Sequence, residues 1–339
     1  ITSTPEELNI VDGGTSATST TVVDADRLIL NDDGTMKQIA VTDLNTYLGS
    51  ATSIDGLSDA KSEGSNFTGS LLIGHETTGT LNDSYYNTGV GLRALESLTH
   101  GDWNTAIGYW ALSSNTGGEY NTASGGKALY HNTTGDRNTA NGYYALYSNT
   151  TGYYNTASGY GALYANTTGY NNTAYGYETL KLNTTGQGNT AIGLQALLSN
   201  TTGTANTASG YGALVKNTTG FGNTASGLNA LTKNTTGGYN AASGYEALFS
   251  NTTASYNTAS GSRALKFNTT GTYNAASGYR ALYNNTTGGY NAAIGSEALY
   301  NNTTGINNTA SGWRALYSNT TASYNTASGY RALRENTTG

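Results

Sequence analysis

From about Ser70 onward, apolar and polar positions recur with a period of 17 residues, and no 3.6-residue helical period runs through them. The Asn that opens each repeat stands at Asn87, Asn104, Asn121 and so on to Asn325, without insertion or deletion. A degenerate copy from Ser70 brings the number of repeats to sixteen, the last of them truncated. A strict period over this length indicates a solenoid or a repeat array.

We count repeat positions from the opening Asn as position one, so that the consensus reads NTASGYxALYxNTTGxx. Position five is Gly in all sixteen copies, position nine is Leu in fifteen, and positions three and twelve are Ala and Asn in fourteen each. An obligatory Gly predicts a positive φ or a backbone approach that leaves no room for Cβ. The Asn-Thr-Thr-Gly segment is typical of a turn whose Gly, at position fifteen, is left-handed.

Two short segments rich in Tyr, Thr and Ala lie between these corners, from position sixteen to position four of the next copy and from position six to position ten. Both predict strands, so each repeat is expected to form one coil of an all-β parallel β-roll. Coils about 4.8 Å apart would make a rod on the order of 75 Å long. In-register stacking would place equivalent residues above one another as ladders, represented in one coil by Asn155, Ala157, Gly159, Ala162, Leu163, Asn166 and Gly169.

Each coil has only one large aliphatic residue and two alanines to bury, which is little apolar area against the conformational entropy of a fully ordered repeat. This composition favours association of several chains. Position four is Ser in nine copies and Ile, Val, Asn or Tyr in others, so it is either shared between chains or exposed.

The first 48 residues are more acidic, do not repeat, and predict a small β-rich attachment module, followed by a linker over 49–69 and the shaft over 70–339. Helices are expected from Thr4-Pro5 and over 43–48. A strand over 20–30, a turn at Asn31-Asp32-Asp33-Gly34 and a return strand over 36–41 predict a hairpin. Because Ile1 is not Met and Gly339 lies within a repeat, the sequence reads as part of a longer chain.

The composition disfavours several classes of partner and site. Charged residues make up 11% of the 339 residues, with a net charge of −6 and no basic cluster, which disfavours nucleic acid as a partner. The absence of Cys excludes disulfides and thiolate metal sites, and no apolar run is long enough to cross a membrane. His75, His100 and His131 share no repeat position and are read as isolated surface residues. No catalytic, metal or cofactor residue is nominated, and an enzyme is not expected.

Tyrosine concentrates at positions six, ten, sixteen and seventeen. The simpler interpretation is strand propensity with stacking between coils, and the alternative is a platform for sugars of a host surface. Position seven varies widely and is interpreted as a solvated face. Recurrent Asn-Thr-Thr sequons are explained by turn chemistry without glycosylation. An ice-binding solenoid and a monomeric three-sided β-helix are weaker alternatives, because the Thr pairs lie in a turn and one aliphatic residue dominates per repeat.

The NTAxGYxALxxNTTGxx repeat resembles the repeats of bacteriophage tail fibres and related bacterial adhesins. Its short strands, closed by an obligatory Gly, are similar to the head repeats of trimeric autotransporter adhesins, which are trimers of left-handed parallel β-rolls. The segments ELNIVDG and VVDADRLILNDDGTMKQIAVTDLNTYL resemble linker modules of phage tail-fibre proteins. The resemblance implies a homotrimeric virion shaft, extracellular or on a bacterial surface, that joins other tail proteins at its N-terminal side and positions a distal receptor-binding tip. An adhesin whose repeat surface binds host polysaccharide is the alternative.

Overall fold

The computed structural model describes residues 27–32, 35–40, 60–62, 68–74 and 83–337, and the chain divides into two units, Ile1–Ser58 and Asp59–Gly339. In the first unit, β1 (Arg27–Asp32) pairs antiparallel with β2 (Thr35–Ala40). The expected hairpin is therefore present, with Asp32 in the first strand rather than in the turn. The helices expected near Thr4 and over 43–48, and the strand segment over 20–26, lie outside the described residues.

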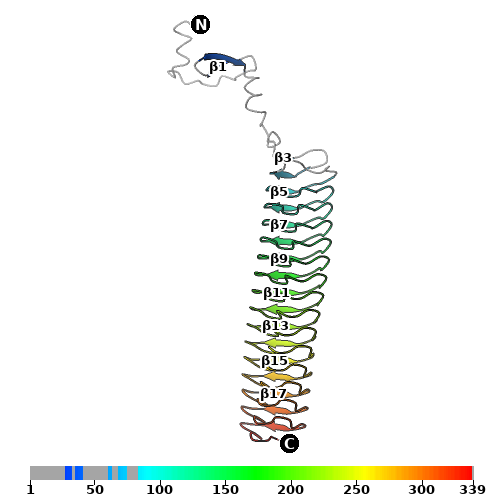
Figure 1. Cartoon of the computed structure of the whole chain (residues 1–339), viewed down its shortest axis with the longest axis vertical. Helices are drawn as coiled ribbons and strands as arrows, with labels where there is room; N and C mark the ends of the chain where they lie inside the picture. The colour runs from blue at the N-terminus through cyan, green and yellow to red at the C-terminus, as the bar shows by residue number, and fades with distance from the viewer. Residues whose placement is uncertain (1–26, 33–34, 41–59, 63–67, 75–82, 338–339) are drawn as a thin grey trace. The chain divides into compact units, whose positions relative to one another are not determined.

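The second unit is a stack of coils, each contributing one short strand (Figure 1). Strand β3 (Ala60–Ser62) pairs antiparallel with β4 (Leu71–Ile73), and from β4 onward each strand pairs in parallel with the next. Sixteen parallel strands follow at a constant interval of one repeat: β4, β5 (Thr88–Val90), β6 (Thr105–Ile107), β7 (Thr122–Ser124), β8 (Thr139–Asn141), β9 (Thr156–Ser158), β10 (Thr173–Tyr175), β11 (Thr190–Ile192), β12 (Thr207–Ser209), β13 (Thr224–Ser226), β14 (Ala241–Ser243), β15 (Thr258–Ser260), β16 (Ala275–Ser277), β17 (Ala292–Ile294), β18 (Thr309–Ser311) and β19 (Thr326–Ser328). The predicted all-β solenoid with a parallel sheet is confirmed. Strand β3, however, falls inside the segment 49–69 that was expected to be only a linker.

The register keeps equivalent repeat positions opposite each other along the whole sheet. Thr156, Ala157 and Ser158 pair with Thr173, Ala174 and Tyr175 of the next coil, and the same offset of one repeat holds at each parallel pair. Each strand covers repeat positions two to four. The side chains at repeat positions two and four point outward and the one at position three points inward, as the alternation of side chains along a strand requires.

The interior is a narrow column of small side chains. Ala at positions three and eight and Leu at position nine are almost completely buried in the coils between β6 and β18. Ala157, Ala162 and Leu163, for example, have no exposed surface. Because Leu at position nine is the large apolar side chain that these coils bury, it fills the column, and alanines allow the two walls of the roll to approach closely.

The second predicted strand, positions six to ten, is wrong. This segment is a turn in every regular coil, with positive φ at positions seven and nine. Leu163 has φ +53° and Glu178 has φ +52°. Its backbone still bonds along the axis: Leu163 N–H donates to the Thr179 carbonyl at 3.0 Å and Glu178 N–H to the Tyr160 carbonyl at 2.9 Å. Left-handed residues therefore let the chain change direction while its amides stay aligned with neighbouring coils.

The expectation of a left-handed Gly at position fifteen is also wrong. The Gly residues at this position lack a positive φ, and Ala254 and Ala322 occupy it in two coils. The left-handed residue of this corner is two positions later, at position seventeen, where Tyr256 has φ +61°. No Val, Ile or Thr stands at position seven, nine or seventeen in the coils from β5 onward, which agrees with the cost of positive φ for β-branched residues.

The invariant Gly at position five meets both conditions predicted for it. Gly142 has φ +134°, and a Cβ on it would lie 2.6 Å from the carbonyl oxygen of Gly159 in the next coil. A side chain here would therefore separate adjacent coils. This contact explains why every repeat keeps Gly at the position.

Candidate functional site

Two ladders of asparagine side chains run inside the roll. At position one, Asn155 accepts hydrogen bonds on Oδ1 from the backbone N–H of Asn172 at 3.0 Å and from its Nδ2 at 3.2 Å. Asn155 Nδ2 in turn donates to Asn138 Oδ1 at 3.1 Å. The side chains at this position are buried in the regular coils, so these contacts are shielded from water.

The second ladder stands at position twelve and meets the first at one carbonyl. Asn166 Nδ2 donates to Asn149 Oδ1 at 2.8 Å and to the Gly169 carbonyl at 2.9 Å. The Gly169 carbonyl also accepts Asn155 Nδ2 at 2.8 Å. From the coil of β6 to that of β18, one backbone oxygen thus accepts a hydrogen bond from both amide ladders, which is why an Asn stands at each of the two positions.

The seven ladder residues selected from the sequence occupy these stacks. Ala157, Ala162 and Leu163 form the apolar column, Asn155 and Asn166 form the amide ladders, and Gly159 lies at the close backbone contact. Gly169 acts through its carbonyl, not through a left-handed conformation. The Asn of each Asn-Thr-Thr sequon is the buried Asn of position twelve, so a glycan on it would be incompatible with the folded roll.

Aromatic side chains form separate stacks on the outside. At position seventeen, Tyr239, Tyr256, Tyr273 and Tyr290 stack with ring centroids 4.9–5.2 Å apart and stay about half exposed. At position ten, further tyrosines stack at 5.0–5.3 Å, among them Tyr147 and Tyr164 at 5.0 Å. These spacings are those of stacked coils, so the expected stacking between coils is present.

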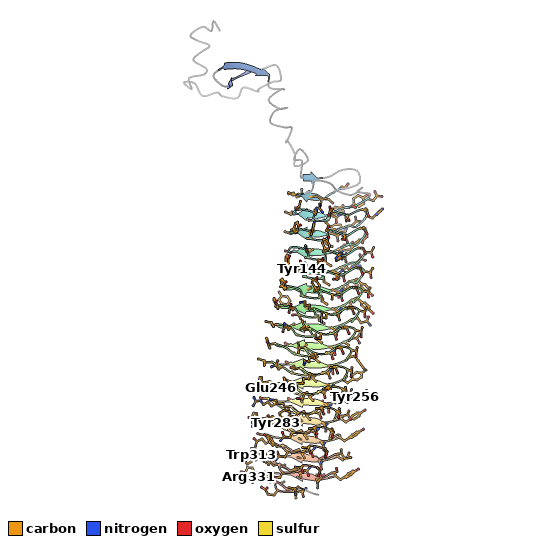
Figure 2. All side chains as sticks on the ribbon, viewed as in Figure 1. Tyr144, Glu246, Tyr256, Tyr283, Trp313 and Arg331 are labelled. Carbon is orange, nitrogen blue, oxygen red and sulfur yellow. The ribbon has the colours of Figure 1, made fainter. Side chains whose placement is uncertain are left out.

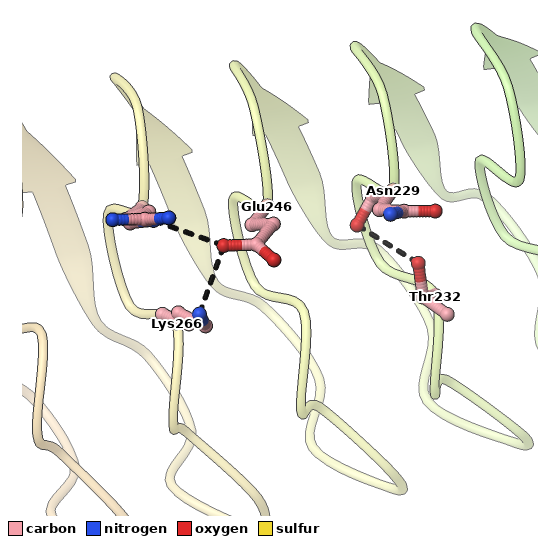
Figure 3. Close-up of polar contacts among 5 residues, drawn as sticks. Asn229, Thr232, Glu246 and Lys266 are labelled. Atoms are coloured by element: carbon pink, nitrogen blue, oxygen red, sulfur yellow. Dashed lines mark hydrogen bonds and ion pairs between the residues drawn. The ribbon is translucent and has the colours of Figure 1, made fainter.

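Position seven carries a line of charged side chains, although its variety had predicted only a solvated face. In Figure 2, Glu246, Trp313 and Arg331 lie along one edge of the roll and Tyr256 lies along the other. Figure 3 shows Lys266 of the next coil beside the carboxylate of Glu246, with Nζ 2.8 Å from Oε2. Arg263 of that coil binds the same oxygen through Nε at 2.9 Å. The sequence contains the pattern that predicts this ion pair, because a Glu and an Arg stand at position seven of successive repeats.

These contacts also set the protonation of the carboxylate. Burial alone would raise the pKa of Glu246, but hydrogen bonds from Lys266 and Arg263 outweigh it and hold the pKa below its ordinary value. At Glu178, hydrogen bonds from Lys181 and Gln195 lower the pKa in the same way. Both carboxylates are therefore ionised at neutral pH.

A groove of about 650 Å³ follows the axis between positions eleven and thirteen. Lys233, Phe267 and Asn284 line one side and threonines from Thr252 to Thr320 line the other. The threonine hydroxyls donate to carbonyls of the next coil, as Thr269 Oγ1 does to Thr286 at 3.0 Å. The protons of Thr252, Thr269, Thr286 and Thr303 are therefore used within the roll and are not free for a ligand.

Within the described residues, no group of three or more His, Asp or Glu side chains could hold a metal ion. His75 lies outside them. His131 packs edge-on against Tyr130 and Tyr147, with ring centroids 4.6 and 4.9 Å away, and burial lowers its pKa. In the part of the chain that the structure describes, no helix has the length and apolarity of a membrane span.

The described coils thus combine neutral ladders inside the roll with aromatic stacks and charged side chains outside it. Comparisons of the chain with family models, curated proteins and solved structures found no match.

Proposed function

We propose that this chain is a structural virion protein, the rigid shaft of a tail fibre that holds a receptor-binding tip away from the particle during host attachment. The observation that carries the proposal is the unbroken one-repeat offset between sixteen parallel strands. A coil that can only stack on a copy of itself makes a rod whose length is set by the number of repeats. The resemblance of the repeat to those of tail fibres and adhesins supports the same role.

We further propose that three chains associate side by side. Several large apolar side chains lie at position four, on the outward face of the strands, where Ile192 and Ile294 are 48% and 59% exposed. Exposed apolar residues in line along a sheet favour contact with another chain. Sedimentation equilibrium should give three times the chain mass of 35.1 kDa. A stable, folded monomer would contradict the trimer.

The location can be tested on the intact assembly. Antibody against the repeat region, viewed by electron microscopy, should label the shaft of a fibre between the particle and its tip, with the N-terminal side toward other tail or fibre proteins. Labelling of a bacterial surface would instead support the adhesin role. Labelling of neither would contradict both.

A further inference from the structure

The charged side chains of the C-terminal coils lie on one side of the roll. Residues 240–337 contain six Lys and Arg residues and three Glu residues, and all nine stand at positions seven, ten or eleven. The chain as a whole has a net charge of −6. These coils therefore present a basic line on an otherwise acidic protein, and the remaining surface of the same coils is uncharged.

The charges at position seven repeat every three coils. The order is Glu, Arg, Arg from Glu246 to Arg280, and again from Glu297 to Arg331. In each group the Glu binds the first Arg: Glu246 binds Arg263 at 2.9 Å, and Glu297 binds its following Arg at 2.6 Å. The second Arg of each group has no carboxylate within ion-pair distance among the described residues.

The two unpaired arginines each lie beside two aromatic rings, one of which belongs to the preceding residue, and the second ring differs between them. The guanidinium carbon of Arg280 lies 4.9 Å from the ring centroid of Tyr279 and 5.3 Å from that of Tyr283. That of Arg331 lies 5.3 Å from Tyr330 and 4.8 Å from a tryptophan ring, Trp313 of the preceding coil. Ring faces hold a guanidinium without using its N–H donors. Because Nε of Arg280 is buried, the donors left for a ligand at this residue are those of its two Nη atoms.

The side chains between and beside the two arginines indicate the kind of ligand. Arg280 and Arg331 are three coils apart, about 14 Å along the axis at about 4.8 Å per coil. Between them, Glu297 and its arginine partner form an ion pair, so no free cation stands there. A polymer with an anionic group on every unit, such as a nucleic acid, would place anionic groups beside this pair without a partner. Exposed rings beside each Arg, such as Tyr279 and Tyr330, offer apolar faces for sugar rings.

We propose that Arg280 and Arg331, with the aromatic rings beside them, form a two-point binding site for an acidic polysaccharide whose carboxylate or other anionic groups are separated by neutral sugars. Each guanidinium binds one anionic group in a bidentate manner, and the rings contact the sugars on either side. Binding at two points on one rigid rod raises the affinity above that of either point alone. This site is additional to the shaft role and does not depend on it.

The test uses the full chain and three probes: hyaluronan, which carries one carboxylate on every second sugar, neutral dextran, and a single-stranded oligonucleotide. Hyaluronan should bind at low salt and weaken as salt increases, with dextran not bound and the oligonucleotide bound more weakly. Arg280→Gln and Arg331→Gln should each weaken hyaluronan binding about tenfold, and the double variant should abolish it. Lys216→Gln, which removes an exposed cation from another part of the roll, should leave binding unchanged.

A variant that is expected to gain binding shows that a loss in the other variants is not caused by unfolding. Glu297→Gln removes the carboxylate and frees its arginine partner, so hyaluronan binding should strengthen severalfold. Binding of dextran as strong as that of hyaluronan, stronger binding of the oligonucleotide, or no hyaluronan binding at low salt would each overturn the proposal. An equal loss in Lys216→Gln and Arg280→Gln would do so as well.

Discussion

Asn155 and Asn138 occupy the same place in successive coils and are joined by two hydrogen bonds to one oxygen: Asn138 Oδ1 accepts the Asn155 backbone N–H at 3.0 Å and its Nδ2 at 3.1 Å. The same bonds recur along the ladder, so each Asn donates to the Oδ1 of the previous coil and accepts, on its own Oδ1, from the Asn of the next coil. A roll with one Leu per coil is thereby stabilised by buried polar ladders as much as by apolar contact.

Replacing Asn155 with Ala should therefore be costly. It removes four hydrogen bonds, so the backbone N–H and Nδ2 of Asn172, the Asn138 Oδ1 and the Gly169 carbonyl each lose one bond. We expect a loss of about 2–4 kcal/mol in the free energy of unfolding, as for buried groups left unsatisfied. Urea denaturation followed by circular dichroism measures it.

Asn171→Ala is the matched control. Asn171 is exposed at position seventeen, and the same position holds Ala205 with a similar positive φ. Its replacement should change stability by less than about 0.5 kcal/mol. Equal effects of the two substitutions would show that the amide ladder does not stabilise the roll.

The positive φ of Leu163 makes its side chain shape critical. Leu163→Ile keeps the volume but places a β-branched residue at φ +53°, whereas Leu163→Met keeps an unbranched Cβ. We expect the Ile variant to lose at least about 2 kcal/mol and the Met variant less than about 1.5 kcal/mol. Thermal unfolding of the two proteins in parallel measures the difference, and an Ile variant as stable as the Met variant would argue against the left-handed conformation.

Gly142→Ala should separate the coil that contains Gly142 from the next coil. Its Cβ would lie 2.6 Å from the Gly159 carbonyl oxygen, so the two coils must move apart and their hydrogen bonds weaken. Because coils contact only their neighbours, we expect unfolding in two steps instead of one. Gly161→Asn is the control: it has space around its Cβ and a φ of +61°, and Asn229 occupies the same repeat position. A single unchanged transition for Gly142→Ala would contradict the close contact.

Stability should depend little on pH until acid conditions are reached, because the buried polar side chains of the described roll are Asn, Ser and Thr. Glu246 has a pKa below its ordinary value of 4.5, so its ion pairs stabilise the fold above that pH and this contribution is lost as the pH falls toward the lower folded pKa. The melting temperature should be flat from about pH 7 to 8, decrease slightly below about pH 6.5 because the lowered pKa of His131 opposes its protonation in the fold, and decrease further below about pH 4.5. Glu246→Gln should reduce the second decrease, and an equal decrease in the variant would exclude this ion pair as a cause.

The repeat period, the parallel stack and its ladders could be predicted from the sequence, because a coil that contacts only its own copies shows every contact as a recurring residue. The path of the chain within a coil could not. Leu163 and Tyr164 stand in a segment with strand propensity, but the coil must close within one repeat, and this closure imposes left-handed residues that local propensity does not reveal. The ion pair of Glu246 with Arg263 also escaped prediction, since it depends on comparing one position across coils instead of along the chain.

The repeats form a rigid rod whose length is set by the number of coils, one per repeat. Duplicating residues 155–205 adds three complete coils and keeps every ladder in register, whereas a duplication one residue shorter breaks the register. Electron microscopy of the purified chains measures the rod directly. We predict that the in-register insertion lengthens it by about 14 Å without loss of stability, at about 4.8 Å per coil, and that the shorter insertion does not give a longer intact rod. An unchanged length, or equal behaviour of the two insertions, would contradict the account.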